Sequence, residues 1–193
     1  HEMKGKARIA IFASGSGTNA EEIIKYFQGH RFTEIVLLLS NNSGAYALIR
    51  AGKYGVGTKV FTKYQFRESE EVLDWLMEAK ITHLVLAGFL WLIPQNLVRA
   101  FPHRIINIHP ALLPRHGGKG MYGMKVHQAV KTAGEKETGI TIHEVNERYD
   151  EGQILFQGTC EVLSSDTPEQ IADKVHRLEH AHYPKVIEKW IET

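Results

Sequence analysis

An asparagine and a histidine stand two residues apart in the stretch 105–114, IINIHPALLP. The stretch has the pattern of a short apolar strand that runs into a turn stiffened by two prolines. Residues two apart on an extended chain point to the same side, so we expect Asn107 and His109 to share one face. At the carboxyl end of a parallel strand, this pair could stabilise a developing negative charge and transfer a proton. The structural alternative is a buried Asn that caps a turn and a core His, and spacing alone favours it.

A second candidate is the sequence GSGTN at residues 15–19, between an expected strand and an expected helix. Its glycines let the backbone approach an anion, and the N–H groups of the following helix would point at it. It is neither the dinucleotide fingerprint, which needs a third glycine, nor a Walker motif, which ends in Gly-Lys-Ser/Thr. An ordinary tight turn is the alternative, but the position after the first strand favours a phosphate site.

Two further groups of polar residues are ambiguous by sequence. Asp150 lies in a loop between two expected strands, where it either forms a turn or acts as a carboxylate that keeps His109 protonated. His176 and His180 are one helical turn apart, but no third zinc ligand is evident, so we interpret them as a solvated or phosphate-facing stripe and expect no metal site. Spacing does not decide the roles of the remaining candidates, His116, His127 and His143.

The elements that must position these residues alternate between strands and helices. Apolar runs predict strands at 7–13, 35–39, 58–61, 84–87, 105–109, 139–145 and 154–162. Helical spacing predicts helices at 20–27, 45–51, 68–79 and 126–133, a short one from Pro94, and a long one from Thr167 that Pro184 should kink or break. The alternation indicates an α/β fold, with a doubly wound, mostly parallel sheet, flanking helices and a Rossmann-type N-terminal half.

Composition favours a soluble enzyme-sized protein. The 193 residues are 43% hydrophobic with a formal net charge of +1, which suits one domain over residues 1–193 and gives no electrostatic signature of nucleic-acid or membrane binding. The single cysteine, Cys160, excludes an internal disulfide and favours a reducing compartment, so we expect a cytoplasmic location. Residues 1 and 2 precede the first methionine, and we expect them to be a cloning remnant.

Taken together, the motifs resemble those of the phosphoribosylglycinamide formyltransferases, folate-dependent enzymes of the formyltransferase superfamily. The resemblance covers most of the chain, with motifs at 14–19, 86–89, 107–114, 139–143, 150–152 and 179–184 in the family's order and spacing. It implies transfer of a formyl group from 10-formyltetrahydrofolate, as co-substrate, to the amine of 5'-phosphoribosylglycinamide in de novo purine (IMP) biosynthesis. It implies no metal.

The resemblance also implies roles for individual residues. The catalytic trio is expected to be Asn107, His109 and Asp150. The phosphoribosyl substrate is expected to contact Gly17, Thr18, Asn19, His176 and Glu179. The folate is expected to contact Arg67, Leu90, Trp91, Leu92, Ile93, Asn107, Val145 and Tyr149. Trp91 departs from the arginine of many relatives, which predicts a more apolar folate rim, and the loop 117–123 is longer and richer in glycine than in some relatives.

The implied mechanism is direct attack of the amine on the formyl carbon. Asn107 and a protonated His109 would stabilise the tetrahedral oxyanion. Free imidazole has a pKa of ~6.5, and an ionised Asp150 would raise it. His109 would then give its proton to the departing folate nitrogen.

Two other classes of function compete with this one. Methionyl-tRNA formyltransferase and formyltetrahydrofolate deformylase share the core but add a further domain, for which this chain has no room. A non-catalytic phosphate-binding module is the other alternative, and the presence of all three trio residues argues against it. The expected partners are the two small-molecule substrates, with no nucleic acid and no membrane, and the protein is expected to be a monomer or homodimer.

Overall fold

The computed structural model describes residues 5–148 and 151–193. Within them a seven-stranded sheet has the order β3-β2-β1-β4-β5-β6-β7. The strands are β1 (Ala7–Phe12), β2 (Thr33–Ser40), β3 (Gly57–Val60), β4 (His83–Leu86), β5 (Ile105–His109), β6 (Glu137–Glu144) and β7 (Ile154–Glu161). Strands β1 to β5 pair in parallel, and β6 and β7 are antiparallel additions at one edge. The mostly parallel α/β sheet is confirmed, and the order of its first five strands is of the Rossmann type.

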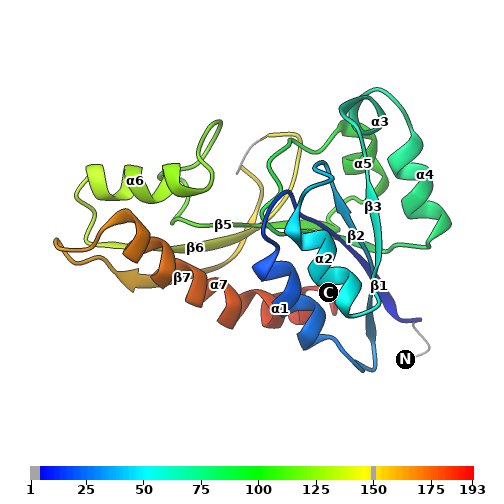
Figure 1. Cartoon of the computed structure of the whole chain (residues 1–193), viewed down its shortest axis with the longest axis horizontal. Coiled ribbons are helices and arrows are strands. Elements are labelled where there is room, and N and C mark those ends of the chain that lie inside the picture. Colours follow the sequence, from blue (N-terminus) through cyan, green and yellow to red (C-terminus); the bar gives the residue numbers. More distant parts are fainter. Residues whose placement is uncertain (1–4, 149–150) are drawn as a thin grey trace.

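Helices cover both faces of the sheet (Figure 1). Core side chains of α1 (Thr18–Tyr26), α2 (Tyr46–Lys53), α6 (Met124–Thr132) and α7 (Pro168–Trp190) cluster with Ile9 and Ile11 of β1. Those of α3 (Lys63–Arg67), α4 (Glu71–Glu78) and α5 (Gln95–Ala100) cluster with Ala10 and Phe12. Successive residues of β1 thus serve opposite faces, because side chains alternate along a strand. Strand β4 and most of β1 are therefore buried on both sides, whereas the edge strand β3 is exposed.

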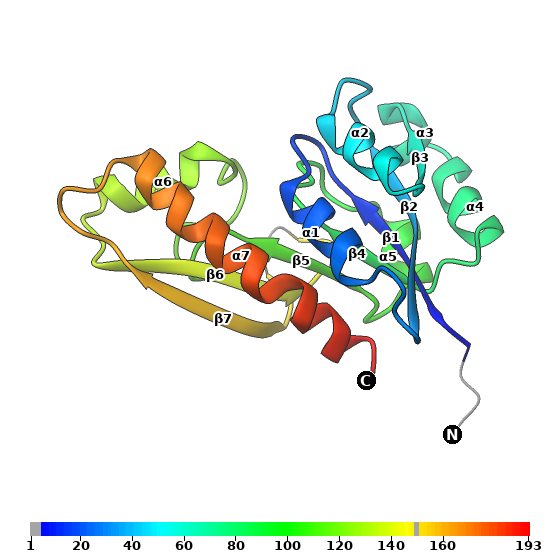
Figure 2. The ribbon, with the colours of Figure 1, turned by 60° about the horizontal axis from the view of Figure 1, so that its bottom comes forward.

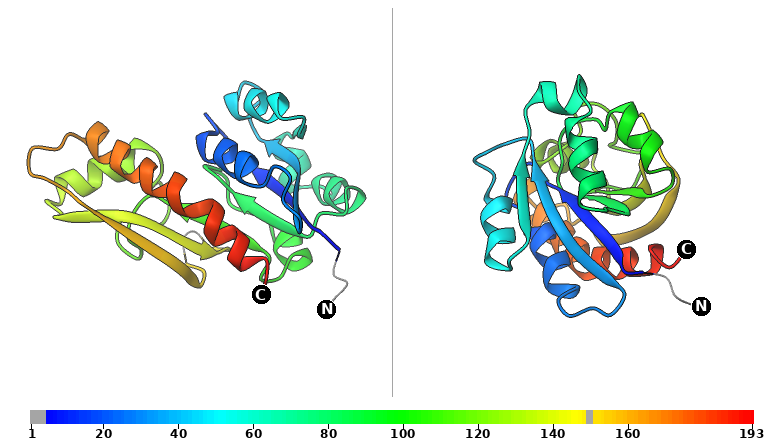
Figure 3. Two further views of the ribbon diagram at one scale, coloured as in Figure 1. Left: turned by 90° about the horizontal axis from the view of Figure 1, so that it is seen from below. Right: turned by 90° about the vertical axis from the view of Figure 1, so that its right-hand side faces the viewer.

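Helix α7 connects the antiparallel edge of the sheet to helix α1. It runs along β6 and β7 and reaches α1 (Figures 2 and 3). Its fully buried Tyr183 donates a hydrogen bond from its hydroxyl to the carbonyl oxygen of Leu86, at 2.8 Å, where β4 ends. Residues from the C-terminal helix are therefore held against the carboxyl ends of the central strands.

The helix expected over 68–79 is confirmed as α4, which begins three residues later, at Glu71. The Ser69 hydroxyl separates it from α3, because it donates to the carbonyl of Gln65 in α3 and accepts from the N–H of Glu71 at the start of α4. The break expected as one alternative at Pro184 is wrong. Pro184 does not break α7, which continues to Trp190. Pro184 and its neighbour Tyr183 are buried, so packing of α7 on the sheet offsets the lost N–H bond.

Candidate active site

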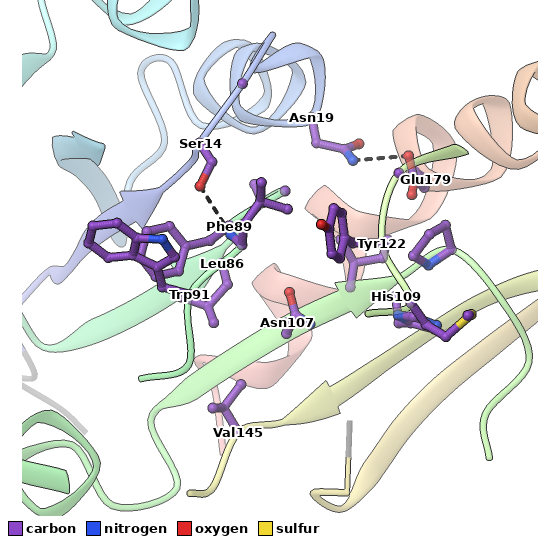
Figure 4. Close-up of a pocket in the computed structure, with 18 of the residues that line it drawn as sticks. Ser14, Asn19, Leu86, Phe89, Trp91, Asn107, His109, Tyr122, Val145 and Glu179 are labelled. Carbon is purple, nitrogen blue, oxygen red and sulfur yellow. Dashed lines mark hydrogen bonds between the residues drawn. The ribbon is translucent and has the colours of Figure 1, made fainter. Parts of the chain in front are cut away.

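A cavity of about 680 Å³ opens at the carboxyl ends of β1, β4 and β5. Parallel α/β sheets bind ligands at this edge, and the volume is in the usual range for a small-molecule site. Figure 4 shows Leu86 and Trp91 on one side of Asn107, with Asn19 and Glu179 on the other. The cavity thus has an apolar end and a polar end, and Asn107 lies between them.

Gly17 starts helix α1 at the polar end. Its φ of 75° is in the left-handed region, and a Cβ there would lie 2.5 Å from the Cα and Cβ of Ala47. Only glycine fits this position without displacing α2. Gly17, Thr18 and Asn19, the predicted phosphate turn, all line the cavity.

Helix α2 holds the turn that precedes α1. The backbone N–H of Ala47 donates to the carbonyl of Gly15 at 3.0 Å, and Arg50 Nε donates to the carbonyl of Ser16 at 2.6 Å. The first N–H groups of α1 have no partner within the helix and point out of its N-terminus. This arrangement suits a bound anion.

Glu179 joins the polar end from α7. Asn19 Nδ2 donates to Glu179 Oε1 at 3.0 Å, which ties α1 to α7. Burial raises the pKa of the Glu179 carboxyl, while His176 and the bond from Asn19 act in the opposite direction. His176 also lines the cavity, one helical turn before Glu179.

Asn107 and His109 both line the cavity, so the side shared by the two residues is the cavity side, as their spacing predicts. His109 is 4% exposed, and its Nε2 donates to the carbonyl oxygen of His116 at 2.8 Å. Because a carbonyl oxygen only accepts, Nε2 carries a proton in this arrangement. The protonation of Nδ1 is then what distinguishes neutral imidazole from imidazolium.

His143 orients the amide of Asn107. The antiparallel register of β5 and β6 places the two residues opposite each other, with Asn107 Nδ2 3.4 Å from His143 Nε2. His143 Nδ1 donates to the carbonyl of Glu144 at 2.8 Å, so in the neutral ring Nε2 accepts from Asn107. One N–H of Asn107 is thereby committed to His143, and the other remains for a ligand.

The segment predicted to contact folate lines the apolar end, with Leu90, Trp91, Leu92 and Ile93 in the cavity wall and Val145 nearby. Trp91 also packs against the rings of Phe61, Phe66 and Phe89, at centroid distances of 6.0, 5.8 and 6.4 Å. It is therefore both a cavity residue and part of an aromatic cluster.

Arg67 is placed differently from the other predicted folate contacts. It does not line the cavity, and its guanidinium lies 5.4 Å from the centre of the Trp91 ring. Its contact with the site is through Trp91. Asp150 and Tyr149, the remaining predicted site residues, lie outside the described residues.

The cavity residues that were not predicted from the sequence as site residues include Ser14, Tyr122, His127 and His143. Ser14 directly precedes the glycine turn, which is the one signal that could have indicated it. The two histidines have no distinctive spacing, because β6 and α6 bring them to the site from distant parts of the chain. Among the residues that the structure describes, no group of three His, Cys, Asp or Glu residues is arranged to hold a metal ion.

Comparison with known proteins matches residues 7–187 to the formyl transferase family model. The chain belongs to the formyl transferase family. A chloroplastic phosphoribosylglycinamide formyltransferase of Arabidopsis thaliana is 42% identical over 97% of this chain, and that of Vigna unguiculata is 38% identical. The chain spans 66% and 64% of the lengths of these two plant relatives.

A solved structure matches over almost its whole length. The phosphoribosylglycinamide formyltransferase of Brucella melitensis is 36% identical, with a TM-score of 0.85 over 96% of this chain and 95% of its own. The expected formyltransferase-like fold is thus confirmed. The relatives include a protein of about the length of this chain and longer ones that match it over part of their length.

Proposed function

We propose that this formyl transferase moves a formyl group from 10-formyltetrahydrofolate to the primary amine of 5'-phosphoribosylglycinamide. The names of its relatives support this acceptor. The observation that carries the proposal is one cavity that has an apolar end and a polar end, with Asn107 between them. The apolar end suits the flat ring system of a folate, and the turn before α1 suits the phosphate of the ribonucleotide.

The two ligands would meet at Asn107 and His109. Attack of the amine on the formyl carbon converts a carbonyl into a tetrahedral oxyanion. The N–H of Asn107 that is not committed to His143 would donate to this oxyanion, and a protonated His109 would stabilise its charge. His109 would then donate its proton to the departing folate nitrogen, so that no covalent enzyme intermediate is required.

Asp150 is assigned the role of the acidic partner on sequence grounds alone. An ionised carboxylate near His109 would favour the imidazolium form. The folate contacts at Arg67 and Tyr149 are proposed on the same grounds.

A formyl-transfer assay tests the function directly. The protein is mixed with 10-formyltetrahydrofolate and either the ribonucleotide, methionyl-tRNA or water alone, and both loss of the folate formyl group and formation of formylated product are measured. We expect folate deformylation only with the ribonucleotide, with equal amounts of formylated product. Equal rates in water alone would identify a deformylase, and activity with methionyl-tRNA alone would identify the other alternative. No activity in any arm would favour a non-catalytic binding module.

The proposal extends to the partners and the oligomeric state of the protein. No helix in the described ranges has the length and apolar content needed to cross a membrane. We propose that the protein acts on small molecules without nucleic acid, as a monomer or homodimer. The cytoplasmic location stays a prediction from the cysteine content.

A further inference from the structure

His127 is a buried histidine in the cavity wall that the proposed reaction does not use. It lies in α6, is 2% exposed and lines the cavity together with His176 and Glu179. Its ring meets that of His176 edge-on, with centroids 6.4 Å apart and planes at 89°. Two imidazoles from different helices therefore lie together in the cavity wall.

Nδ1 of His127 is buried and makes no hydrogen bond within the described part of the chain. Buried polar atoms almost always have a partner, and one without a partner destabilises the fold. His109 and His143 of the same cavity differ, since a backbone carbonyl holds a ring nitrogen of each. The unpartnered Nδ1 of His127 therefore indicates that its hydrogen-bond partner is a ligand that enters the cavity.

We propose that His127, with His176, binds the phosphate group of the ribonucleotide substrate. The inference rests on the proposed function for the identity of that substrate. Phosphate oxygens accept hydrogen bonds, and imidazole donates one from either nitrogen. A half-turn of the His127 ring about Cβ–Cγ exchanges the positions of Nδ1 and Cδ2 and of Nε2 and Cε1, so it redirects the donor, and it breaks no bond of Nδ1.

The surrounding charges favour a phosphate over a sugar hydroxyl at His127. The titratable groups that act on it are His176 from α7 and His109 from β5, while Glu179 of α7 lies in the same cavity wall beside His176. The Glu179 carboxylate accepts hydrogen bonds and repels anions, so it is suited to the hydroxyls of the ribose. The two imidazoles have no such repulsion and can donate.

Protonation of His127 is not required for binding. Burial, followed by the neighbouring His176 and His109, lowers the pKa of His127 to about 4. The ring is therefore neutral at pH 7 and donates from its one N–H group. Binding of phosphate by this residue needs no uptake of a proton.

A leucine substitution with a matched control tests the proposal. His127→Leu removes the unpartnered nitrogen, so we expect an equal or higher Tm. The dissociation constant of ribose 5-phosphate should rise about 10- to 100-fold, as for loss of a hydrogen bond to a charged group. His180→Leu is the control, because Nε2 of His180 is also buried without a partner among the described residues, but His180 does not line the cavity. It should leave the affinity unchanged, and His127→Gln provides a polar variant should the leucine variant not fold.

NMR of the imidazole groups distinguishes phosphate from sugar. In the wild-type protein the His127 signals should shift with inorganic phosphate and with ribose 5-phosphate, and remain in place with ribose. A shift with ribose alone, or wild-type affinity in the His127 variants, would overturn the proposal. These measurements do not depend on catalysis. Binding of ribose 5-phosphate through His127 without formyl transfer would refute the proposed function and leave this site intact, whereas transfer with unaltered binding in the variants would refute the site alone.

Discussion

The backbone N–H of Leu90 donates to the side-chain oxygen of Ser14 at 3.0 Å. The Ser14 hydroxyl in turn donates to Asn41 Oδ1 at 2.6 Å, and the serine is 6% exposed. One buried hydroxyl thus connects the end of β1 to the segment that lines the apolar end of the cavity (Figure 4). The position of the proposed folate segment depends on the residue that precedes the phosphate turn.

Ser14→Ala should therefore disturb the proposed folate end. Losing the shared hydroxyl leaves the Leu90 N–H without this acceptor, which should lower the free energy of unfolding by about 1–2 kcal/mol and weaken a folate analogue several-fold. Denaturant titration and fluorescence binding measure the two effects. Ser43→Ala, an exposed serine after β2, is the control. Wild-type folate affinity in Ser14→Ala would contradict the role of this bond.

Gly17→Ala should cost more stability than Gly55→Ala. Both glycines have positive φ, 75° and 73°, so both variants suffer the strain of left-handed backbone, about 1–2 kcal/mol. Only at Gly17 would the new Cβ also meet Ala47, since nothing lies within 4 Å of a Cβ at Gly55. Thermal unfolding measures the difference. Ribonucleotide affinity should fall in Gly17→Ala alone, and equal loss of both ligands would indicate a folding defect instead of a damaged phosphate turn.

Trp91→Ala should weaken folate binding and lower stability together. The sequence predicts Trp91 at the folate rim, and in the structure Trp91 packs against Phe61 and Phe66 as well as lining the cavity. Truncation should cost about 1–3 kcal/mol, less than for a fully buried aromatic residue. Trp91→Phe should recover most of the stability. Unchanged folate affinity in the Ala variant, measured by titration, would remove Trp91 from the folate site.

Asp150→Asn tests the acidic partner predicted from the sequence. The change removes the charge and preserves the shape, so fewer His109 rings would be protonated at neutral pH. We expect kcat to fall by orders of magnitude with little change in either KM, and the residual activity to rise as the pH is lowered. NMR titration of His109 in both forms is the direct measurement. An unaltered titration would refute the electrostatic role even if activity were lost.

Because His83 is buried, we expect the wild-type protein to be less stable in mild acid than at neutral pH. Burial, and secondarily Arg104, lowers the pKa of His83 from 6.5 to about 4. The unfolded chain then binds more protons than the native state between these values, so stability is fully present above pH ~6.5 and falls as the pH drops toward 4, by at most about 3 kcal/mol. His83→Phe keeps a flat ring against Trp190, 5.0 Å away, and should reduce this slope in denaturant titrations. His103→Gln, which changes an exposed histidine, should keep the wild-type slope.

The sequence by itself determined that strands alternate with helices to form the sheet. It also determined that Asn107 and His109 lie on one side of β5. Strands alternate with helices because short apolar runs and helical spacing are local properties, and Asn107 and His109 share a side because a strand repeats every two residues. The turn before α1 was predicted for the same reason, since glycine conformations are set locally.

Only the tertiary structure decided which distant residues complete the site. His143 reaches Asn107 through the register of antiparallel strands, and Glu179 reaches Asn19 across 160 residues of chain because α7 packs beside α1. Packing on the sheet carries α7 past Pro184, and packing of α6 against α7 brings His127 against His176. These relationships depend on which surfaces bury one another, and no local pattern of residues specifies that.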